Sequence, residues 1–145
     1  MIRKTLGVVL FAFLLIVAGC TSSAEHHFSD SRFDGQVTVE NGSLYLTIAK
    51  APFGATVKDI TIEKYVGGDV GYEYLRDCND VYPVKVGEKH KLSCFPDKPG
   101  KYLLRFTLYH TAGSDYKKVN GESCIVYKGG SQDCESYADL SFEVK

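Results

Sequence analysis

The sequence predicts an all-β protein, an antiparallel sandwich of about seven strands. Three observations support this fold class. Short segments in which apolar and polar residues alternate recur along the chain. Glycine, proline and Asn-Gly pairs separate these segments. No segment shows the periodicity of an amphipathic helix, so short turns rather than long crossovers are expected to join the strands.

The first nineteen residues differ in composition from the rest of the chain. Arg3 and Lys4 precede an unbroken apolar run over residues 6–18. This run is too short to cross a hydrocarbon core, which takes about 20 helical residues. It matches the apolar region of a signal peptide, so residues 1–19 are expected to be removed and to play no part in the fold.

The predicted cleavage region reads Val17-Ala18-Gly19-Cys20 and resembles the lipobox of prokaryotic lipoproteins. The resemblance implies that a diacylglyceryl group modifies the Cys20 thiol and that the mature chain starts at Cys20. Acyl chains such as palmitate then anchor the protein on the extracytoplasmic face of the cell membrane, and two chains give stable attachment. The alternatives are an ordinary secreted protein with a cysteine near its cleavage site, or a retained signal anchor.

Residues 20–34 are rich in Ser, His and Asp and show neither helical nor strand periodicity, so they are predicted to form a lipidated tether. The folded domain is then expected to span residues 35–145. Its first two strands contain the alternating sets Val37 and Val39, and Leu44, Leu46 and Ile48. Asn41-Gly42 lies between them and predicts a tight hairpin.

Four further segments are predicted strands in the middle of the chain. Residues 57–65 place Ile60 and Ile62 on one face, and Gly67-Gly68 ends the pattern. Shorter candidates cover residues 71–75, 81–84 and 90–94. Pro83 lacks a backbone donor, which favours an edge position for its strand.

The clearest strand is residues 101–110, where one face carries Tyr102, Leu104, Phe106 and Leu108. The preceding Pro99-Gly100 turn and Tyr102 resemble the start of a late strand in immunoglobulin-like and fibronectin-type domains. That resemblance implies an immunoglobulin-like sandwich in which Tyr102 forms a tyrosine corner. The last strand is predicted over residues 138–144, with Leu140, Phe142 and Val144 inward.

A glycine-containing stretch separates Leu108 from Ala138 and encloses a possible strand over residues 124–127. It is predicted to be an excursion from the sandwich. Cys78, Cys94, Cys124 and Cys134 remain when Cys20 is set aside, and an even number in an exported domain predicts two disulfides. Three connectivities are open; pairing of neighbours, Cys78 with Cys94 and Cys124 with Cys134, is favoured because it closes short loops.

The cysteines also admit a four-thiolate zinc site or a redox-active pair, but neither has the Cys-x-x-Cys spacing typical of such sites. His26, His27, Asp30 and Asp34 would form a metal site on the tether only at a cost in ordering entropy. No catalytic or cofactor motif is present. We therefore expect no catalytic residue, metal or cofactor.

Tyrosine is the one compositional excess, with ten residues and no tryptophan. Tyrosine packs well in strands, and it also supplies rigid contact area for a protein or glycan partner. The candidate partner-binding residues are Tyr72, Tyr74, Tyr82, Tyr109, Tyr116 and Tyr127.

The formal net charge of -1 gives no electrostatic footprint for nucleic acid. We expect a non-catalytic binding or structural module of the cell envelope, displayed on the surface by its lipid. A small-ligand or metal-binding lipoprotein associated with a transporter is the alternative, followed by an envelope enzyme. Asn41 begins a glycosylation sequon that the hairpin turn explains equally well.

Overall fold

The computed structural model describes residues 26–145, so the predicted signal peptide and Cys20 lie outside the described residues. This part of the chain is all-β, and it contains no helix long and apolar enough to span a membrane. The strands are β1 (His26–Phe28), β2 (Asp34–Glu40), β3 (Ser43–Lys50), β4 (Thr56–Gly67), β5 (Gly71–Cys78), β6 (Tyr82–Pro83), β7 (Lys89–Lys91), β8 (Gly100–Ala112), β9 (Ser123–Val126) and β10 (Gln132–Val144).

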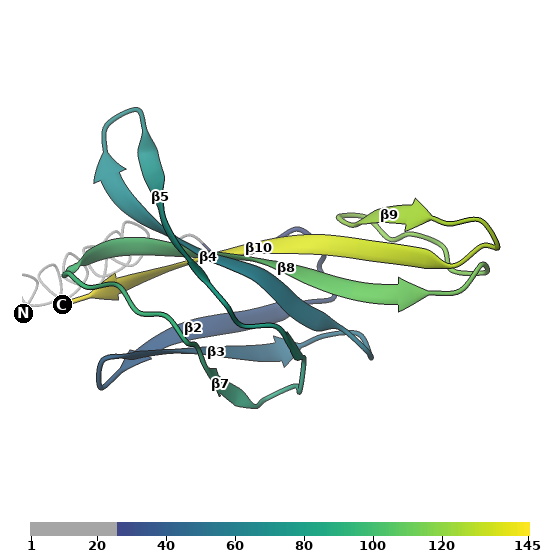
Figure 1. Ribbon diagram of the computed structural model, residues 1–145, viewed down its shortest axis with the longest axis horizontal. Helices are drawn as coiled ribbons and strands as arrows, with labels where there is room; N and C mark the ends of the chain where they lie inside the picture. Colours follow the sequence, from purple (N-terminus) through teal and green to yellow (C-terminus); the bar gives the residue numbers. More distant parts are fainter. Residues whose placement is uncertain (1–25) are drawn as a thin grey trace, which may run out of the picture.

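The strands form two antiparallel sheets, which confirms the predicted sandwich (Figure 1). The larger sheet has the order β1-β10-β8-β4-β5, with β6 beside β4 and β9 beside β10. The smaller sheet has the order β2-β3-β7. The sheet β2-β3-β7 faces the strands β10, β8, β4 and β5 of the larger sheet. This is the strand arrangement of an immunoglobulin-like sandwich.

The core lies between the two sheets and follows the alternation in the sequence. Leu44, Leu46 and Ile48 of β3 are almost fully buried. They belong to one cluster with Leu104 and Phe106 of β8. Burial of an aliphatic or aromatic side chain of this size contributes about 1.5–3 kcal/mol, so these two faces dominate the stability of the sandwich.

Two local predictions are also confirmed. Asn41 and Gly42 both have positive φ, at 50° and 74°, and connect β2 to β3 as a two-residue hairpin turn. The hydroxyl of Tyr102 donates to the carbonyl oxygen of Lys98, which makes the tyrosine corner at the start of β8. The disulfides join Cys78 to Cys94 and Cys124 to Cys134, as neighbour pairing predicts.

The predicted tether is wrong from His26 onward. β1 pairs with β10 in the register His26↔Leu140, and Phe33 is 3% exposed within the core. The domain therefore starts at or before His26 rather than at Gly35. Three residues of strand are too few to show alternation, and pairing with a strand more than a hundred residues away leaves no local signal.

Several strand boundaries also differ from prediction; β5, for example, runs to Cys78 rather than to residue 75. The last strand starts at Gln132 rather than Ala138. The hydrophobic pattern misses its first half because the side chains turned inward there are Gln132, Cys134 and Ser136. The strand predicted over residues 90–94 is only Lys89–Lys91.

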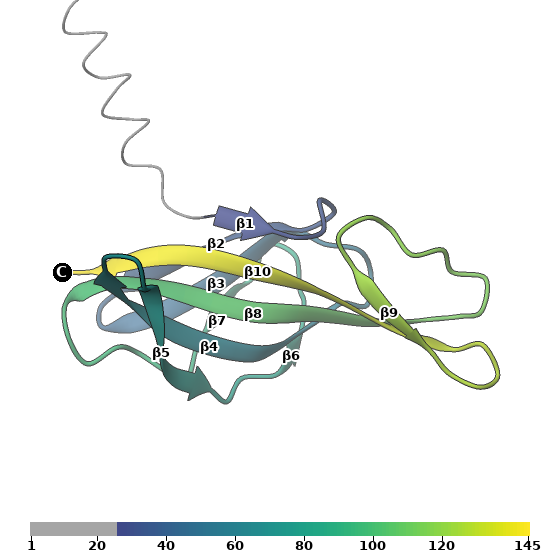
Figure 2. The ribbon, with the colours of Figure 1, turned by 90° about the horizontal axis from the view of Figure 1, so that it is seen from above.

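One part of the larger sheet extends beyond the sandwich. Pairing of β4 with β8 ends at Thr56↔Tyr109, whereas β8 and β10 continue together to Ala112↔Gln132. We call residues 110–136, which include β9 and the loops around it, the arm. Figures 1 and 2 show the arm projecting from the end of the sandwich opposite the C-terminus. The predicted excursion is this arm.

Candidate functional site at the base of the arm

Ser29, which directly follows β1, pins the arm to the sandwich. Its backbone N–H donates to the carbonyl of Tyr137, and its hydroxyl donates to the carbonyl of Gly121. Gly121 has a φ of +89°, and a Cβ there would lie 1.7 Å from the carbonyl oxygen of Ser29. Only glycine permits this approach of two segments that are far apart in the sequence.

Glu122, the next residue, is the centre of a buried polar cluster. Its Oε2 lies 2.9 Å from Nη2 of Arg32 and 3.0 Å from Nε2 of His110. Its Oε1 accepts hydrogen bonds from the Tyr116 hydroxyl and from the Val119 N–H. The carboxylate thus has partners from the segment after β1, from β8 and from the loop between β8 and β9, and its side chain is 1% exposed.

Asp30 completes the cluster on the side of the sandwich. Its carboxylate accepts a hydrogen bond from the Arg32 backbone N–H at 3.0 Å and binds the guanidinium through Nη2 at 2.7 Å. Arg32 therefore bridges two buried carboxylates, Asp30 and Glu122. The base-of-arm cluster is Asp30, Arg32, His110, Tyr116 and Glu122.

The hydrogen bonds in this cluster decide its protonation. Burial by itself raises the pKa of Glu122, but hydrogen bonds from Tyr116, His110 and Val119, with the charge of Arg32, lower it overall. Burial likewise acts against ionised Asp30, and the bonds and charge of Arg32 lower its pKa in sum. Both carboxylates are therefore held ionised, and hydrogen bonding to Asp30 raises the pKa of Arg32.

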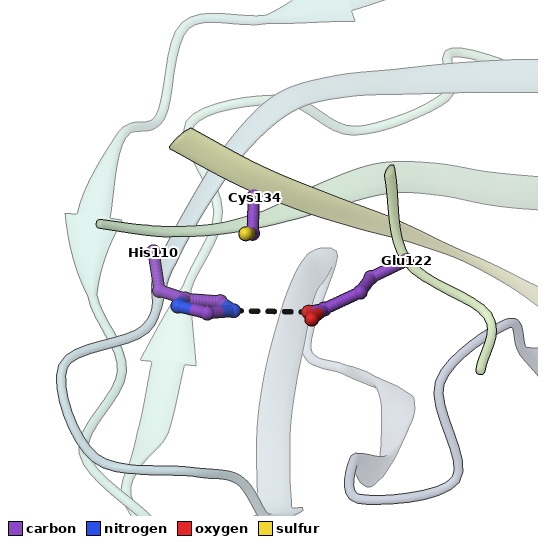
Figure 3. Close-up of side chains that lie close together, drawn as sticks. All are labelled: His110, Glu122 and Cys134. Atoms are coloured by element: carbon purple, nitrogen blue, oxygen red, sulfur yellow. Dashed lines mark hydrogen bonds and ion pairs between the residues drawn. The ribbon is translucent and has the colours of Figure 1, made fainter. Parts of the chain in front are cut away.

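Three potential metal ligands lie close together at the base of the arm. The ligand atoms of His110, Glu122 and Cys134 are within 4.8 Å of one another, and Figure 3 shows the imidazole facing the carboxylate beside the Cys134 sulfur. However, the sulfur of Cys134 is bonded to that of Cys124 in a disulfide. Because the thiolate is the form of cysteine that binds metal, Cys134 is not available as a ligand. The Glu122 carboxylate is also already paired with the guanidinium of Arg32. The arrangement is explained by the arm's attachment to the sandwich.

A second polar group links side chains of β4 and β8 to the arm. The hydroxyls of Tyr109 and Tyr127 each donate to Asp133, both at 2.8 Å. Nζ of Lys58 lies 2.6 Å from Glu135 and 4.5 Å from the centre of the Tyr109 ring. The pKa values of both tyrosines are raised, and hydrogen bonding to Asp133 is the largest cause.

Beyond these contacts the arm exposes apolar side chains. Ile125 is 63% exposed, Val126 65% and Tyr127 47%. They lie on and directly after β9, an edge strand that pairs with β10 alone among the described strands. The arm is thus rigid at its base and apolar along its free edge.

The candidate tyrosines do not form a single surface. Tyr109 of β8 and Tyr127 of the arm meet at Asp133. Tyr72 contacts the ring of Tyr65 on the β4–β5 hairpin, where Tyr74 is 64% exposed. Tyr82 stacks on His90, and Tyr116 belongs to the base-of-arm cluster.

The histidines and acids singled out in the sequence are also dispersed. His26 lies 3.1 Å from Asp34, His27 packs against Tyr137, and Asp30 binds Arg32, so these four residues form no common site. Near Cys78, an open depression of about 340 Å³ contains Asp59, Asp77 and Asp80. Asp80 is already bound to the Ser93 N–H and hydroxyl there.

The base-of-arm cluster is not predicted by the sequence. Arg32 and Glu122 are 90 residues apart, and no motif links them. The only available signal would have been Gly121 beside an isolated glutamate in a stretch otherwise expected to be solvated.

No protein-family model matches this chain, and no curated protein or solved structure shows significant similarity to it. Its function is therefore argued from the geometry of the arm and its base.

Proposed function

We propose that this protein is a non-catalytic, lipid-anchored module of the cell envelope whose arm binds a partner. The observation that carries the proposal is the combination of a fixed base with an exposed apolar edge. A disulfide, Gly121 and the base-of-arm cluster hold the arm, although it projects beyond the core of the sandwich. Exposed apolar residues on a rigid projection are typical of a recognition surface.

Rigidity favours the arm over the other apolar projection, the β4–β5 hairpin. Both expose apolar residues, since Val66 and Val70 of the hairpin are 46% and 64% exposed. A surface that is already ordered loses less conformational entropy on binding. Both projections have a disulfide, Cys78–Cys94 in the hairpin and Cys124–Cys134 in the arm, and both end in a turn that contains glycines. What distinguishes the arm is the buried ionic cluster at its base.

The lipid anchor supports the same proposal. His26, the first described residue, pairs with Leu140, and the chain runs from there toward the arm as far as Phe28↔Ala138. β1 therefore begins at the end of its pairing with β10 that lies farther from the arm, and the proposed anchor at Cys20 precedes β1 in the sequence.

Site-specific photocrosslinking in intact cells tests the binding role. A photoreactive amino acid is placed at Ile125 in the arm, at Val66 in the hairpin, or at Val86, an exposed apolar control. We expect a discrete adduct from Ile125 only. An adduct from Val66 alone would move the binding role to the hairpin, and none from Ile125 would reject the arm.

Membrane fractionation of Cys20→Ser tests the anchor independently. The variant is expected to leave the membrane fraction or to remain unprocessed. The intact mass of the native protein is expected to correspond to a chain that starts at Cys20 and carries acyl chains. Unchanged fractionation would reject lipid anchoring while leaving the role of the arm to the crosslinking experiment.

A further inference from the structure

The free edge of β9 presents backbone groups in a defined pattern. The N–H of Tyr127 donates to the carbonyl of Ser131, so Tyr127 and Ser131 form a hydrogen-bonded pair at the start of the β9–β10 ladder. Bonded and non-bonded pairs alternate in an antiparallel ladder. Ile125↔Asp133 is then a bonded pair, whereas Val126↔Gln132 and Cys124↔Cys134 are not.

The disulfide gives an independent check on this assignment. The Cα atoms of Cys124 and Cys134 are 4.1 Å apart, close to the short spacing of about 4.5 Å typical of non-hydrogen-bonded pairs. The N–H and C=O groups of Cys124 and Val126 therefore point away from β10, and no other described strand pairs with them. They are open to a new strand.

The side chains around this edge are apolar, and most of the exposed charges without a partner there are positive. The acids of β10 opposite β9 are engaged, Asp133 by the hydroxyls of Tyr109 and Tyr127 and Glu135 by Lys58. Ile125 and Val126 lie on opposite faces of β9, and both are mostly exposed. Between residues 113 and 130 the exposed charges are Lys117, Lys118 and Lys128 against Asp115 alone. None of these lysines has an ion-pair partner among residues 26–145, and Glu122 is taken up by the buried cluster.

We propose that β9 accepts an extended acidic peptide segment as an additional antiparallel strand. Four backbone hydrogen bonds would form with Cys124 and Val126, and apolar side chains at successive positions of the peptide, which point to opposite faces, would cover Ile125 on one face and Val126 on the other. Acidic residues at its ends would pair with the lysines. This inference rests on the proposed binding role of the arm and names the chemistry of its partner.

Two other occupants fit the edge less well. A second copy would bring two sets of lysines together, and like charges at an interface oppose association. A membrane would supply no hydrogen-bond partners to the open backbone groups, which hydrocarbon leaves unsatisfied at high cost. A strand with acidic ends would form hydrogen bonds with the open backbone groups and would also pair with the lysines.

Amide hydrogen exchange of the full mature chain tests the inference. The probe is the synthetic peptide Glu-Val-Thr-Val-Thr-Val-Glu with blocked ends, and its counterpart has lysine at both ends. We expect the acidic peptide to slow exchange at Cys124 and Val126 at least about tenfold, because newly bonded amides exchange only after the added strand dissociates. Ile125 already bonds to β10 and should change little. The lysine peptide should give much weaker protection.

Two variants separate the backbone and charge components. Val126→Pro removes an outward N–H without breaking the β9–β10 ladder, and it should abolish protection by the peptide while Ile125 stays protected. Reversal of all three lysines to glutamate should reverse the preference between the two peptides. Ile125 protection in each variant shows that β9 remains in place.

Several outcomes would overturn strand addition. These are equal protection by both peptides, protection that survives Val126→Pro, no protection by either peptide, and concentration-dependent dimers without peptide. Binding to anionic vesicles that Val126→Pro leaves unchanged would assign the edge to a membrane instead. If crosslinking from Ile125 succeeds while the acidic peptide gives no protection, the arm binds a partner by another mode, and only this inference fails.

Discussion

Arg32 and Glu122 lie 90 residues apart in the chain, and Nη2 of one is 2.9 Å from Oε2 of the other. The Glu122 side chain is 1% exposed and that of Arg32 is 32% exposed. This contact fastens the segment after β1 to the loop that leads into β9.

Neutralising Glu122 should loosen the arm. Glu122→Gln keeps the shape of the side chain but leaves Arg32 with a weaker partner, so we expect the free energy of unfolding to fall by about 2 kcal/mol. Chemical denaturation measures the change. Glu88→Gln, at an exposed turn, is the matched control and should change stability by less than about 0.5 kcal/mol. Equal effects of the two variants would contradict a role for the cluster.

Acid should weaken the same attachment. The pKa values of Asp30 and Glu122 are lowered in the folded protein below their ordinary values of 3.8 and 4.5. Their contribution is therefore fully present above about pH 5.5 and is lost as the pH falls below these ordinary values toward the folded ones. Unfolding at several pH values, with the disulfides intact, should show a steeper acid loss for the native protein than for Glu122→Gln. Identical pH profiles would show that Glu122 does not contribute through its charge.

Removing the arm disulfide should affect the arm more than the sandwich. Cys124→Ser with Cys134→Ser opens a small loop, and the chain-entropy estimate gives a cost of about 3 kcal/mol. Trypsin should then cut faster after Lys117, Lys118 or Lys128 while the sandwich stays folded. Cys78→Ser with Cys94→Ser is the comparison, because that bridge belongs to the core and its loss should lower global stability without selective cleavage of the arm. The opposite pattern would show that the arm is held by other contacts.

Gly121→Ala should break the contact between the arm and Ser29. The added Cβ would collide with a backbone oxygen, and φ at +89° is unfavourable for alanine. We expect a loss of at least about 2 kcal/mol. Gly113→Ala is the matched control, since a Cβ there meets nothing within 4 Å. Thermal unfolding distinguishes the two, and a neutral Gly121→Ala would mean that the Ser29 segment moves aside freely.

The core strands could be predicted because local residue order determines them. Alternation along β3 and β8, the Asn41-Gly42 turn and Tyr102 each carry a signal within a few residues. The base of the arm could not, because it depends on contacts between distant segments. The inward face of early β10 consists of Gln132, Cys134 and Ser136, so a pattern based on hydrophobicity misses it.

The histidine and tyrosine candidates show the same limit. His110 carries no partner spacing in the sequence, yet it binds Glu122 once β8 and the following loop are folded together. Composition groups six tyrosines as candidates, but their contacts place Tyr82 against His90 and Tyr116 against Glu122, whereas Tyr127 is exposed on the arm. Residue type alone does not distinguish a packed tyrosine from an exposed one.

We propose that a rigid arm is the recognition element of this protein. Crosslinking from Ile125 in cells should be compared between the otherwise native chain and the same chain carrying Gly121→Ala, at equal protein level and equal membrane attachment. We expect a discrete adduct from the native arm and at least about a tenfold lower yield when the base is disrupted, because a loosened arm must be reordered before it binds. An adduct of unchanged yield in Gly121→Ala, or no adduct from the native arm, would contradict the claim.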